Sequence, residues 1–293
     1  MSEELTRMER LAVAIGRAAN ERPFGKRLQT TWMRTASWWW IRPTLIKRLY
    51  TENLDRLQDY HPEGGTMVVA NHRSFFDQYA IMLAMWSTRV YWARDITFPV
   101  RSNFFYEHPV GALVNVFVTG NAMYPPIFRQ KERTKLNDES LEAVARILAQ
   151  PRQVVGVHPE GTRGKGPDPY ELLPGQPGVG KMAMLAKPMV LPAFVNGLSN
   201  DFLGDVRDGY TKDIRKRRPV IVIYGEPIDM SDLYAQKGRP TLYKKAADRF
   251  MAAIAKLGER EREVRALCAA GKISDDDPNW LMNRPVDRLY VRP

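Results

Sequence analysis

Residues 66–77 read Thr-Met-Val-Val-Ala-Asn-His-Arg-Ser-Phe-Phe-Asp. The run 67–70 is short and apolar, as in a buried strand, and the polar residues after it are typical of a turn. Ser74 followed three residues later by Asp77 is a capping-box pattern, which indicates that a helix begins here. The segment therefore predicts a strand, a turn that contains His72, and a helix with Asp77 in its first turn.

From this point strands and helices alternate along the chain. This alternation is typical of an α/β protein with a mostly parallel central sheet flanked by helices. The clearest helix is 137–149, with Asn137 as its N-terminal cap and apolar residues along one side. We expect strands at 66–70, 89–93, 114–119, 153–158, 189–195 and 219–224, and helices at 75–86, 137–149, 178–186 and 240–257.

The composition is that of an ordinary globular protein. Of 293 residues, 44% are hydrophobic and 26% are charged, which excludes a wholly disordered or collagen-like chain. A single cysteine, Cys268, excludes an internal disulfide framework. There is no run of 18 apolar residues, so we expect no spanning helix, and the first residues lack the pattern of a secretory signal.

The charge is concentrated near the N-terminus. The formal net charge is +11, and a basic chain binds nucleic acid, anionic lipid or phosphorylated molecules. Residues 1–50 hold ten basic and four acidic side chains, together with four of the seven tryptophans. Basic side chains attract anionic headgroups, and tryptophan favours the membrane interface. We therefore expect residues 1–50 to contact an anionic membrane surface peripherally.

Two helices are expected in this region, at 3–20 and at 28–50, with a break at 21–25 and an interruption near Pro43. Residues 38–40 are all tryptophan and cover about 200° of a helix, so some face protein and others face lipid. The alternative is a pair of amphipathic helices packed on the core with solvated arginines. We divide the chain into a helical membrane-association segment (1–58), an α/β domain (59–258), and a C-terminal helix with an irregular tail (259–293).

The pair His72 and Asp77 has the pattern of a general base with its orienting group. Because His72 lies outside the helix, its imidazole can turn back over the first helical turn, where Asp77 accepts a hydrogen bond from one ring nitrogen. The other nitrogen then faces solvent or substrate, ready to take a proton from a hydroxyl near neutral pH. The alternative is a structural histidine beside a helix cap.

A second polar block, His-Pro-Glu-Gly-Thr-Arg, follows the expected strand at 153–158. Arg163 suits bidentate binding of a phosphate, and Thr162 and the Gly161 amide offer further donors. Glu160 either accepts a hydrogen bond from a substrate hydroxyl or holds Arg163 in place. The carboxyl ends of parallel strands meet at one edge of a sheet, so we expect His72 and this block to share a crevice. The alternative is a polar loop with one ion pair.

Together, these blocks resemble the glycerolipid acyltransferase family, of which 1-acylglycerol-3-phosphate acyltransferase is the best-known member. That family carries an Asn-His-x4-Asp block, here at 71–77, and later a Pro-Glu-Gly-Thr-Arg block, here at 159–163. Weaker family blocks are similar to residues 126–129, 189–193 and 220–228, so the resemblance spans about residues 60–232.

The resemblance implies acyl transfer from a thioester of coenzyme A or acyl carrier protein to a lipid hydroxyl. His72 would deprotonate the acceptor hydroxyl and Asp77 would orient His72, without an acyl-enzyme. The acceptor phosphate would be held by Glu160, Gly161, Thr162 and Arg163, together with Arg129. The expected acceptor is 1-acylglycerol-3-phosphate, which gives phosphatidic acid. Glycerol 3-phosphate, another lysolipid and an amino-lipid alcohol stay open as acceptors.

We expect a peripheral enzyme at the cytoplasmic face of the membrane, with no bound cofactor or metal, because no pair of cysteines and no His-Glu-x-x-His motif is present. One rival is a phosphate-binding loop at 175–181, but Met182 stands where serine or threonine is required. A second is a non-enzymatic basic protein that binds lipid or nucleic acid. We expect no nucleic-acid partner, since the aromatic residues do not interleave with basic strands. The basic cluster 215–218 contacts headgroups or a coenzyme phosphate, or is solvated.

Overall fold

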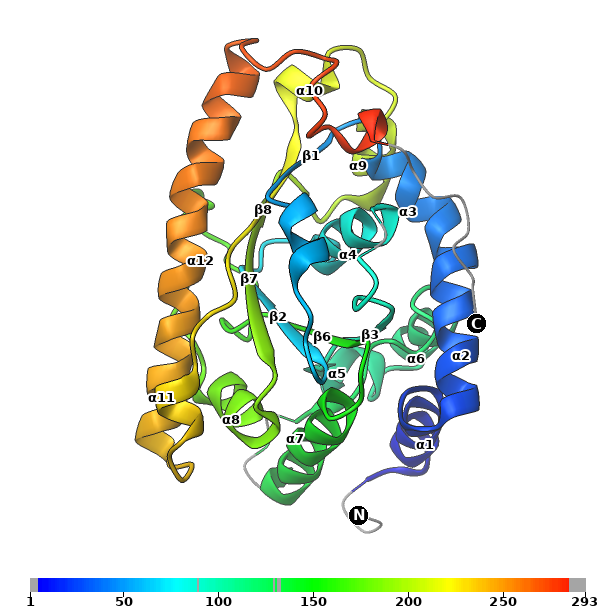
Figure 1. Ribbon diagram of the computed structural model, residues 1–293. Helices are drawn as coiled ribbons and strands as arrows, with labels where there is room; N and C mark the ends of the chain where they lie inside the picture. Colours follow the sequence, from blue (N-terminus) through cyan, green and yellow to red (C-terminus); the bar gives the residue numbers. More distant parts are fainter. Residues whose placement is uncertain (1–4, 89, 129, 131–132, 285–293) are drawn as a thin grey trace.

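The computed structural model describes residues 5–88, 90–128, 130 and 133–284. A six-stranded sheet with the order β1-β8-β7-β2-β6-β3 runs through the centre of the molecule (Figure 1). A second, two-stranded sheet pairs β4 with β5. The strands are β1 (Leu49–Glu52), β2 (Thr66–Ala70), β3 (Asp95–Thr97), β4 (Val100–Arg101), β5 (Pro126–Ile127), β6 (Gln153–Val157), β7 (Met189–Asn196) and β8 (Val220–Tyr224).

The prediction of a mostly parallel central sheet is confirmed. β2 lies between β6 and β7 and is parallel to both, β3 is parallel to β6, and β1 is parallel to β8. Only the pair β7–β8 is antiparallel among the described pairs of this sheet. The strands expected at 66–70, 153–158, 189–195 and 219–224 are all present, with bounds within one residue of the prediction.

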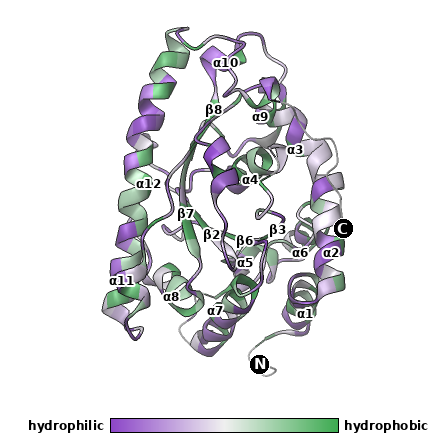
Figure 2. Cartoon of the chain, viewed as in Figure 1, coloured by the Kyte–Doolittle hydropathy of each residue, from purple (hydrophilic) through white to green (hydrophobic). Residues whose placement is uncertain are grey.

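Helices cover both faces of this sheet, and three short π- or 3-10-helical turns are also assigned among the described residues. In Figure 2 the long helix α12 alternates hydrophilic and hydrophobic residues, while β7 is mostly hydrophobic. The helices are α1 (Arg7–Glu21), α2 (Pro23–Trp32), α3 (Trp38–Leu45), α4 (Asp77–Ser87), α5 (Ser102–Phe105), α6 (Pro109–Phe117), α7 (Thr134–Leu148), α8 (Pro177–Ala186), α9 (Phe202–Asp208), α10 (Ile214–Arg217), α11 (Ser231–Tyr234) and α12 (Pro240–Ala269), with turns η1 (Met33–Ser37), η2 (Asp55–Asp59) and η4 (Leu281–Asn283).

Two predicted strands are wrong. The segment 114–119 falls largely in helix α6, whose apolar residues recur every three or four positions and leave one face exposed. Periodicity over six residues does not separate a short apolar helix from a strand. No strand covers 90–93, the described part of the segment 89–93. These residues form a turn in which the Ala93 N–H donates to the Val90 carbonyl, and the edge strand β3 begins at Asp95.

The helix predictions hold with changed bounds. α4 begins at Asp77, and α7 begins at Thr134, three residues before its predicted cap. Asn137 is therefore not an N-terminal cap. It lies inside α7, where its side-chain amide exchanges two 2.7 Å hydrogen bonds with the main chain of Phe128. α12 runs past residue 258 without a break, and β1 pairs with β8 although it lies in the segment 1–58. The division into three segments stays a prediction.

The sheet separates two hydrophobic cores because neighbouring residues of a strand point to opposite faces. In β2, Val68 and Ala70 face a core formed with α3 and α4, while Met67 and Val69 face a core formed with α7, α8 and α12. Every residue of β2 is buried. Gly156 of β6 allows a close approach, since a Cβ there would lie 2.5 Å from the Gln78 side chain of α4. The strands that carry the two sequence blocks, β2 and β6, are thus fully buried.

The N-terminal helices form a continuous arm along one side of the molecule (Figure 1). The predicted break is confirmed at Arg22, between α1 and α2. The helix expected at 28–50 instead ends at Leu45, and its irregular turn is η1 rather than Pro43, which lies within α3. Of the three adjacent tryptophans, Trp39 is 79% exposed, whereas its two neighbours pack against the core. Within the described residues, no helix is both long and apolar enough to cross a bilayer.

A buried ion pair joins this arm to the rest of the fold. The guanidinium of Arg48 lies 2.8 Å from the Asp205 carboxylate at α9, and both side chains are almost inaccessible to solvent. The other carboxylate oxygen accepts hydrogen bonds from the N–H and the hydroxyl of Ser199, each at 3.0 Å.

Replacing Asp205 by alanine is expected to lower the free energy of unfolding by about 3–5 kcal/mol, because Arg48 would remain buried without its counter-charge. Urea unfolding measures this loss. Lys244→Ala, which breaks an exposed ion pair with Asp248 on α12, is the control and should cost less than about 1 kcal/mol. Equal losses in the two variants would contradict the role given to the buried pair.

Candidate active site

The two sequence blocks meet at one edge of the central sheet. β2 and β6 are parallel neighbours with Val69 paired to Val157, so both strands end at the same level. The turn 71–76 follows β2, and the loop 158–166 follows β6. The main-chain N–H of Gly164 donates to the carbonyl of His72 at 2.9 Å, which joins the two segments directly. The predicted juxtaposition of the blocks is confirmed.

His72 is oriented as its sequence position predicts. Its Nδ1 lies 3.1 Å from Oδ2 of Asp77, at the start of α4. The same oxygen accepts the main-chain N–H groups of Arg73 (2.7 Å) and Ser74 (2.8 Å). The turn therefore wraps around a buried carboxylate that receives three donors. Since a carboxylate accepts, Nδ1 of His72 carries the proton and Nε2 keeps its lone pair.

Two buried side chains hold this turn in place. The side-chain amide of Asn71 exchanges two 2.8 Å hydrogen bonds with the main chain of Val195 in β7. One carboxylate oxygen of Glu160 accepts the N–H of His72 at 2.8 Å, and the other accepts the N–H of Leu173 at 2.9 Å. Glu160 is 2% exposed. Its two hydrogen bonds tie together the main chain of the turn and that of the segment around Leu173.

The loop after β6 presents a guanidinium beside the turn. Gly161 has a positive φ of 63°, which favours glycine, and its N–H closes a turn onto the His158 carbonyl. Thr162 is half-buried. Arg163 stacks over the Phe75 ring at 3.8 Å from its centre and donates to Asn200 Oδ1 at 2.6 Å. Arg129, also predicted for this site, lies outside the described residues.

Three residues of the site carried no role in the sequence analysis. Arg101, at the end of β4, donates to the Gly161 carbonyl. Arg73 donates to the Gly166 carbonyl at 2.6 Å. The ring of His158 stacks on that of His72. His158 begins the second block, so its position in the motif could have identified it as a site residue. Arg101 belongs to neither block, and only the fold brings it to the site.

Burial controls the proton affinity of the central groups. Burial, the largest cause, and the positive charges of Arg163 and Arg101 together lower the pKa of His72 to about 3. Burial also lowers the pKa of His158 to about 3, with the neighbouring His72 acting in the same direction. It raises the pKa of Asp77 to about 6, against the stabilising N–H donors of the turn. At pH 7 both imidazoles are therefore neutral and the carboxylate is ionised.

One atom each of His72, Asp77 and His158 lies within 4.8 Å of the others, which raises the question of a metal site. The two rings are stacked with only 5° between their planes. In that arrangement the in-plane lone pairs run side by side and do not converge on one point, as ligands of a metal ion must. The geometry fits a hydrogen-bonded cluster better than a metal centre.

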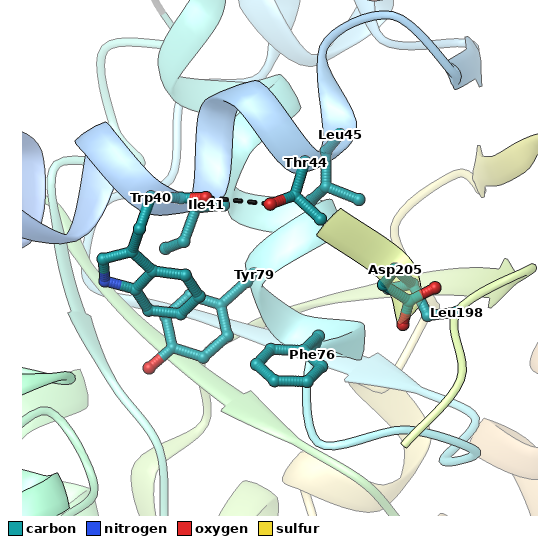
Figure 3. A pocket seen from close by; sticks show the side chains of 8 residues that line it. All are labelled: Trp40, Ile41, Thr44, Leu45, Phe76, Tyr79, Leu198 and Asp205. Carbon is teal, nitrogen blue, oxygen red and sulfur yellow. Dashed lines mark hydrogen bonds between the residues drawn. The ribbon is translucent and has the colours of Figure 1, made fainter. Parts of the chain in front are cut away.

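A small apolar hollow lies behind the turn, between α3 and α4 (Figure 3). The rings of Trp40, Phe76 and Tyr79 line it, with Trp40 and Tyr79 centres 5.6 Å apart. Its free interior is about 10 Å³, room for roughly one water molecule. The rings would have to move before an alkyl chain entered it.

The comparison with known families agrees with this geometry. The model of the family described as Acyltransferase matches residues 48–196, just over half of the chain. The chain belongs to the acyltransferase family. The match runs from the residue before β1 to the end of β7, so it includes both blocks of this acyltransferase and the strands that carry them. No curated protein matches the sequence. The resemblance found in the sequence is thereby confirmed.

The lowered pKa values predict that the acyltransferase loses stability on acidification. The unfolded chain protonates His72 and His158 below about pH 6.5, whereas the folded chain does so only near pH 3. The stability from these two groups is present above pH 6.5 and is lost as the pH falls. Asp77 opposes this between about pH 6 and 4, because the folded chain protonates it first.

The expected net loss between pH 7 and 4.5 is about 3 kcal/mol, at roughly 1.4 kcal/mol per unit of pKa difference. Urea unfolding at the two pH values measures it. The double variant His72→Phe/His158→Phe keeps two aromatic rings without titrating nitrogens, so its stability should depend less on pH. An unchanged dependence in this variant would show that other groups cause the loss.

Proposed function

We propose that this acyltransferase moves a fatty acyl group from a coenzyme A or acyl-carrier-protein thioester to the free hydroxyl of a lysophospholipid. The proposed acceptor is 1-acylglycerol-3-phosphate, and the product is then phosphatidic acid. The observation that carries the proposal is that His72, oriented by Asp77, lies near enough to the guanidinium groups of Arg163 and Arg101 for their charge to lower its pKa. We infer that the imidazole serves as a base for a hydroxyl and the arginines as charges for a phosphate.

In the proposed reaction, Nε2 of His72 takes the proton of the acceptor hydroxyl while Asp77 holds Nδ1. The hydroxyl oxygen attacks the thioester carbonyl carbon and forms a C–O bond. The tetrahedral intermediate then collapses, the C–S bond breaks, and the thiolate takes the proton from His72 to leave as a thiol. The imidazole ends neutral, so one histidine serves as base and then as acid. No acyl-enzyme is needed.

The acceptor itself strengthens the base. The positive charges of Arg163 and Arg101 help to keep the pKa of His72 low, and a neutral imidazole of low pKa is a weak base. A phosphate bound to these guanidinium groups cancels their positive charge. The pKa of His72 then rises, and the imidazole accepts the hydroxyl proton more readily. Substrate binding and proton transfer are coupled through the same two arginines.

Replacing His72 by alanine is expected to lower kcat by about 10²- to 10⁴-fold, the usual contribution of a general base. An assay of thiol release from an acyl thioester in the presence of 1-acylglycerol-3-phosphate measures this. His61→Ala is the matched control, because that histidine is exposed and contacts Tyr91 outside the site. Full activity of the His72 variant would remove the proposed mechanism.

Replacing Arg163 or Arg101 by alanine is expected to raise KM for the phosphorylated acceptor about tenfold or more, since a hydrogen bond between charged groups contributes about 1.5–3 kcal/mol. A monoacylglycerol, which has no phosphate, should be acylated at nearly the same rate by wild type and variants. Lys256→Ala, on an exposed position of α12, is the control. If both acceptors lose activity equally, the arginines do not bind the phosphate.

We also propose a surface on which the protein meets its lipid substrates, the α2–α6 apolar surface. It consists of six large apolar side chains that are 38% to 80% exposed. Trp32 Nε1 donates to the Phe117 carbonyl at 3.0 Å, so the C-terminal ends of the two helices meet. Exposed Arg22 and Arg27 flank this surface and suit anionic headgroups. The six residues are Phe24, Leu28 and Trp32 of α2 and Val110, Leu113 and Phe117 of α6.

The double variant Phe24→Ser/Leu28→Ser is expected to bind anionic vesicles at least about tenfold more weakly, because each methylene buried in lipid contributes about 0.8 kcal/mol. Co-sedimentation with phosphatidylglycerol vesicles measures this. Leu185→Ser on α8 is the control, as that leucine is exposed but lies outside this surface. Point variants are preferred to deletion of residues 1–50, which would remove the buried Arg48. Unchanged vesicle binding would contradict the assignment of this surface.

A further inference from the structure

The ring of His158 lies flat on the ring of His72. Their centres are 3.9 Å apart and their planes differ by 5°. Nδ1 of His158 lies 3.0 Å from the main-chain carbonyl of Ala70. A carbonyl accepts, so this nitrogen carries the proton of the neutral ring and the hydrogen bond fixes the ring plane.

Main-chain hydrogen bonds place both rings. Ala70 ends β2 two residues before His72, and β6 ends at Val157, directly before His158, so the paired strands bring the two histidines to one level. The main chain of His72 is tied to the second block twice, by its N–H to Glu160 and by its carbonyl to Gly164. The stack is thus set by the sheet and does not depend on a chance contact of two mobile side chains.

The imidazole of His72 needs a second contact that holds its ring plane. Its hydrogen bond to Asp77 holds one edge of the imidazole, but this single in-plane contact leaves the ring free to tilt about that axis and, once tilted, to leave Asp77. A tilt would move Nε2, the atom that faces the acceptor hydroxyl. A displacement of about 1 Å in a reacting group lowers a rate by about 10²-fold.

We propose that His158 is a positioning residue for His72: its anchored ring holds the His72 imidazole by stacking, so that Nδ1 stays on Asp77 and Nε2 stays on the acceptor. This inference rests on the proposed role of His72 as the general base. His158 itself transfers no proton and touches no reacting atom. Other charged groups around the pair are Asp77 on α4, Arg101 on β4, and Arg73, Glu160 and Arg163 from the turn and loop.

Three substitutions of His158 test the contribution of its stacking ring separately from that of its hydrogen-bond donor. His158→Phe keeps the stacking ring, His158→Gln keeps a donor for the Ala70 carbonyl but no ring, and His158→Ala keeps neither. We expect the phenylalanine variant to retain kcat within about threefold, and the other two to lose about 10- to 100-fold in kcat, with KM for both substrates changed less than about twofold.

The pH profile gives a readout that a purely structural defect would not move. In His158→Ala, water reaches the His72 ring, its desolvation falls, and the acidic limb of kcat/KM should shift to higher pH. In His158→Phe the limb should stay at the wild-type position. A phenylalanine variant as inactive as the alanine variant, or an alanine variant with wild-type kcat and profile, would overturn the inference.

Nitrogen-15 spectra of histidine-labelled protein keep the inference testable even where His158→Ala does not fold. The chain has four histidines, so the ring signals can be assigned by substitution. At pH 7 we expect the neutral tautomer with Nδ1 protonated for His72 in wild type and His158→Phe, and a mixture of tautomers in His158→Gln. The same single tautomer in His158→Gln would contradict positioning by stacking.

A failure of the positioning role of His158 can be distinguished from a failure of the proposed general base. An inactive His72→Ala variant together with a fully active His158→Ala variant would overturn only the proposed positioning role of His158. A fully active His72→Ala would overturn the general base, whatever the His158 variants do.

Discussion

The oxygen Oδ2 of Asp77 organises the whole site, because three N–H groups point at it from one short turn. Two of these donors belong to the main chain of Arg73 and Ser74, so the carboxylate shapes the turn before it orients the imidazole. A buried charge without such donors would be costly. Asp77 is also the first residue of α4, which lies almost wholly inside the core. The turn that holds His72 is therefore anchored to a well-buried helix.

The second block complements this turn in structure and in charge. Glu160 is the acidic residue of that block, yet it faces inward and holds the main chain of His72 and Leu173. The guanidinium of Arg163 faces the other way, toward Phe75 and Asn200. One loop thus supplies a rigid support on one side and a positive charge on the other. An anionic acceptor would both fill and neutralise this charged side, which links recognition to proton transfer.

Much of the sheet was predictable from the sequence, because buried strands such as β2 and β6 are uninterrupted apolar runs that end in polar motifs. The contact between His72 and Asp77 was also predictable, since both residues belong to one local turn. Arg101 and the stacking of His158 were not, because they arise from the pairing of strands far apart in sequence. The helix α6 was mistaken for a strand since its short apolar run has too few residues to show a period.

The central claim is that one acceptor molecule is held by its phosphate at the arginines while its hydroxyl meets His72. A crystal structure of the protein with 1-acylglycerol-3-phosphate and a non-hydrolysable thioester analogue tests it most directly. We expect the phosphate within hydrogen-bond distance of Arg163 or Arg101 and the free hydroxyl about 3 Å from Nε2 of His72. A phosphate bound elsewhere, with the hydroxyl turned away from the imidazole, would contradict it.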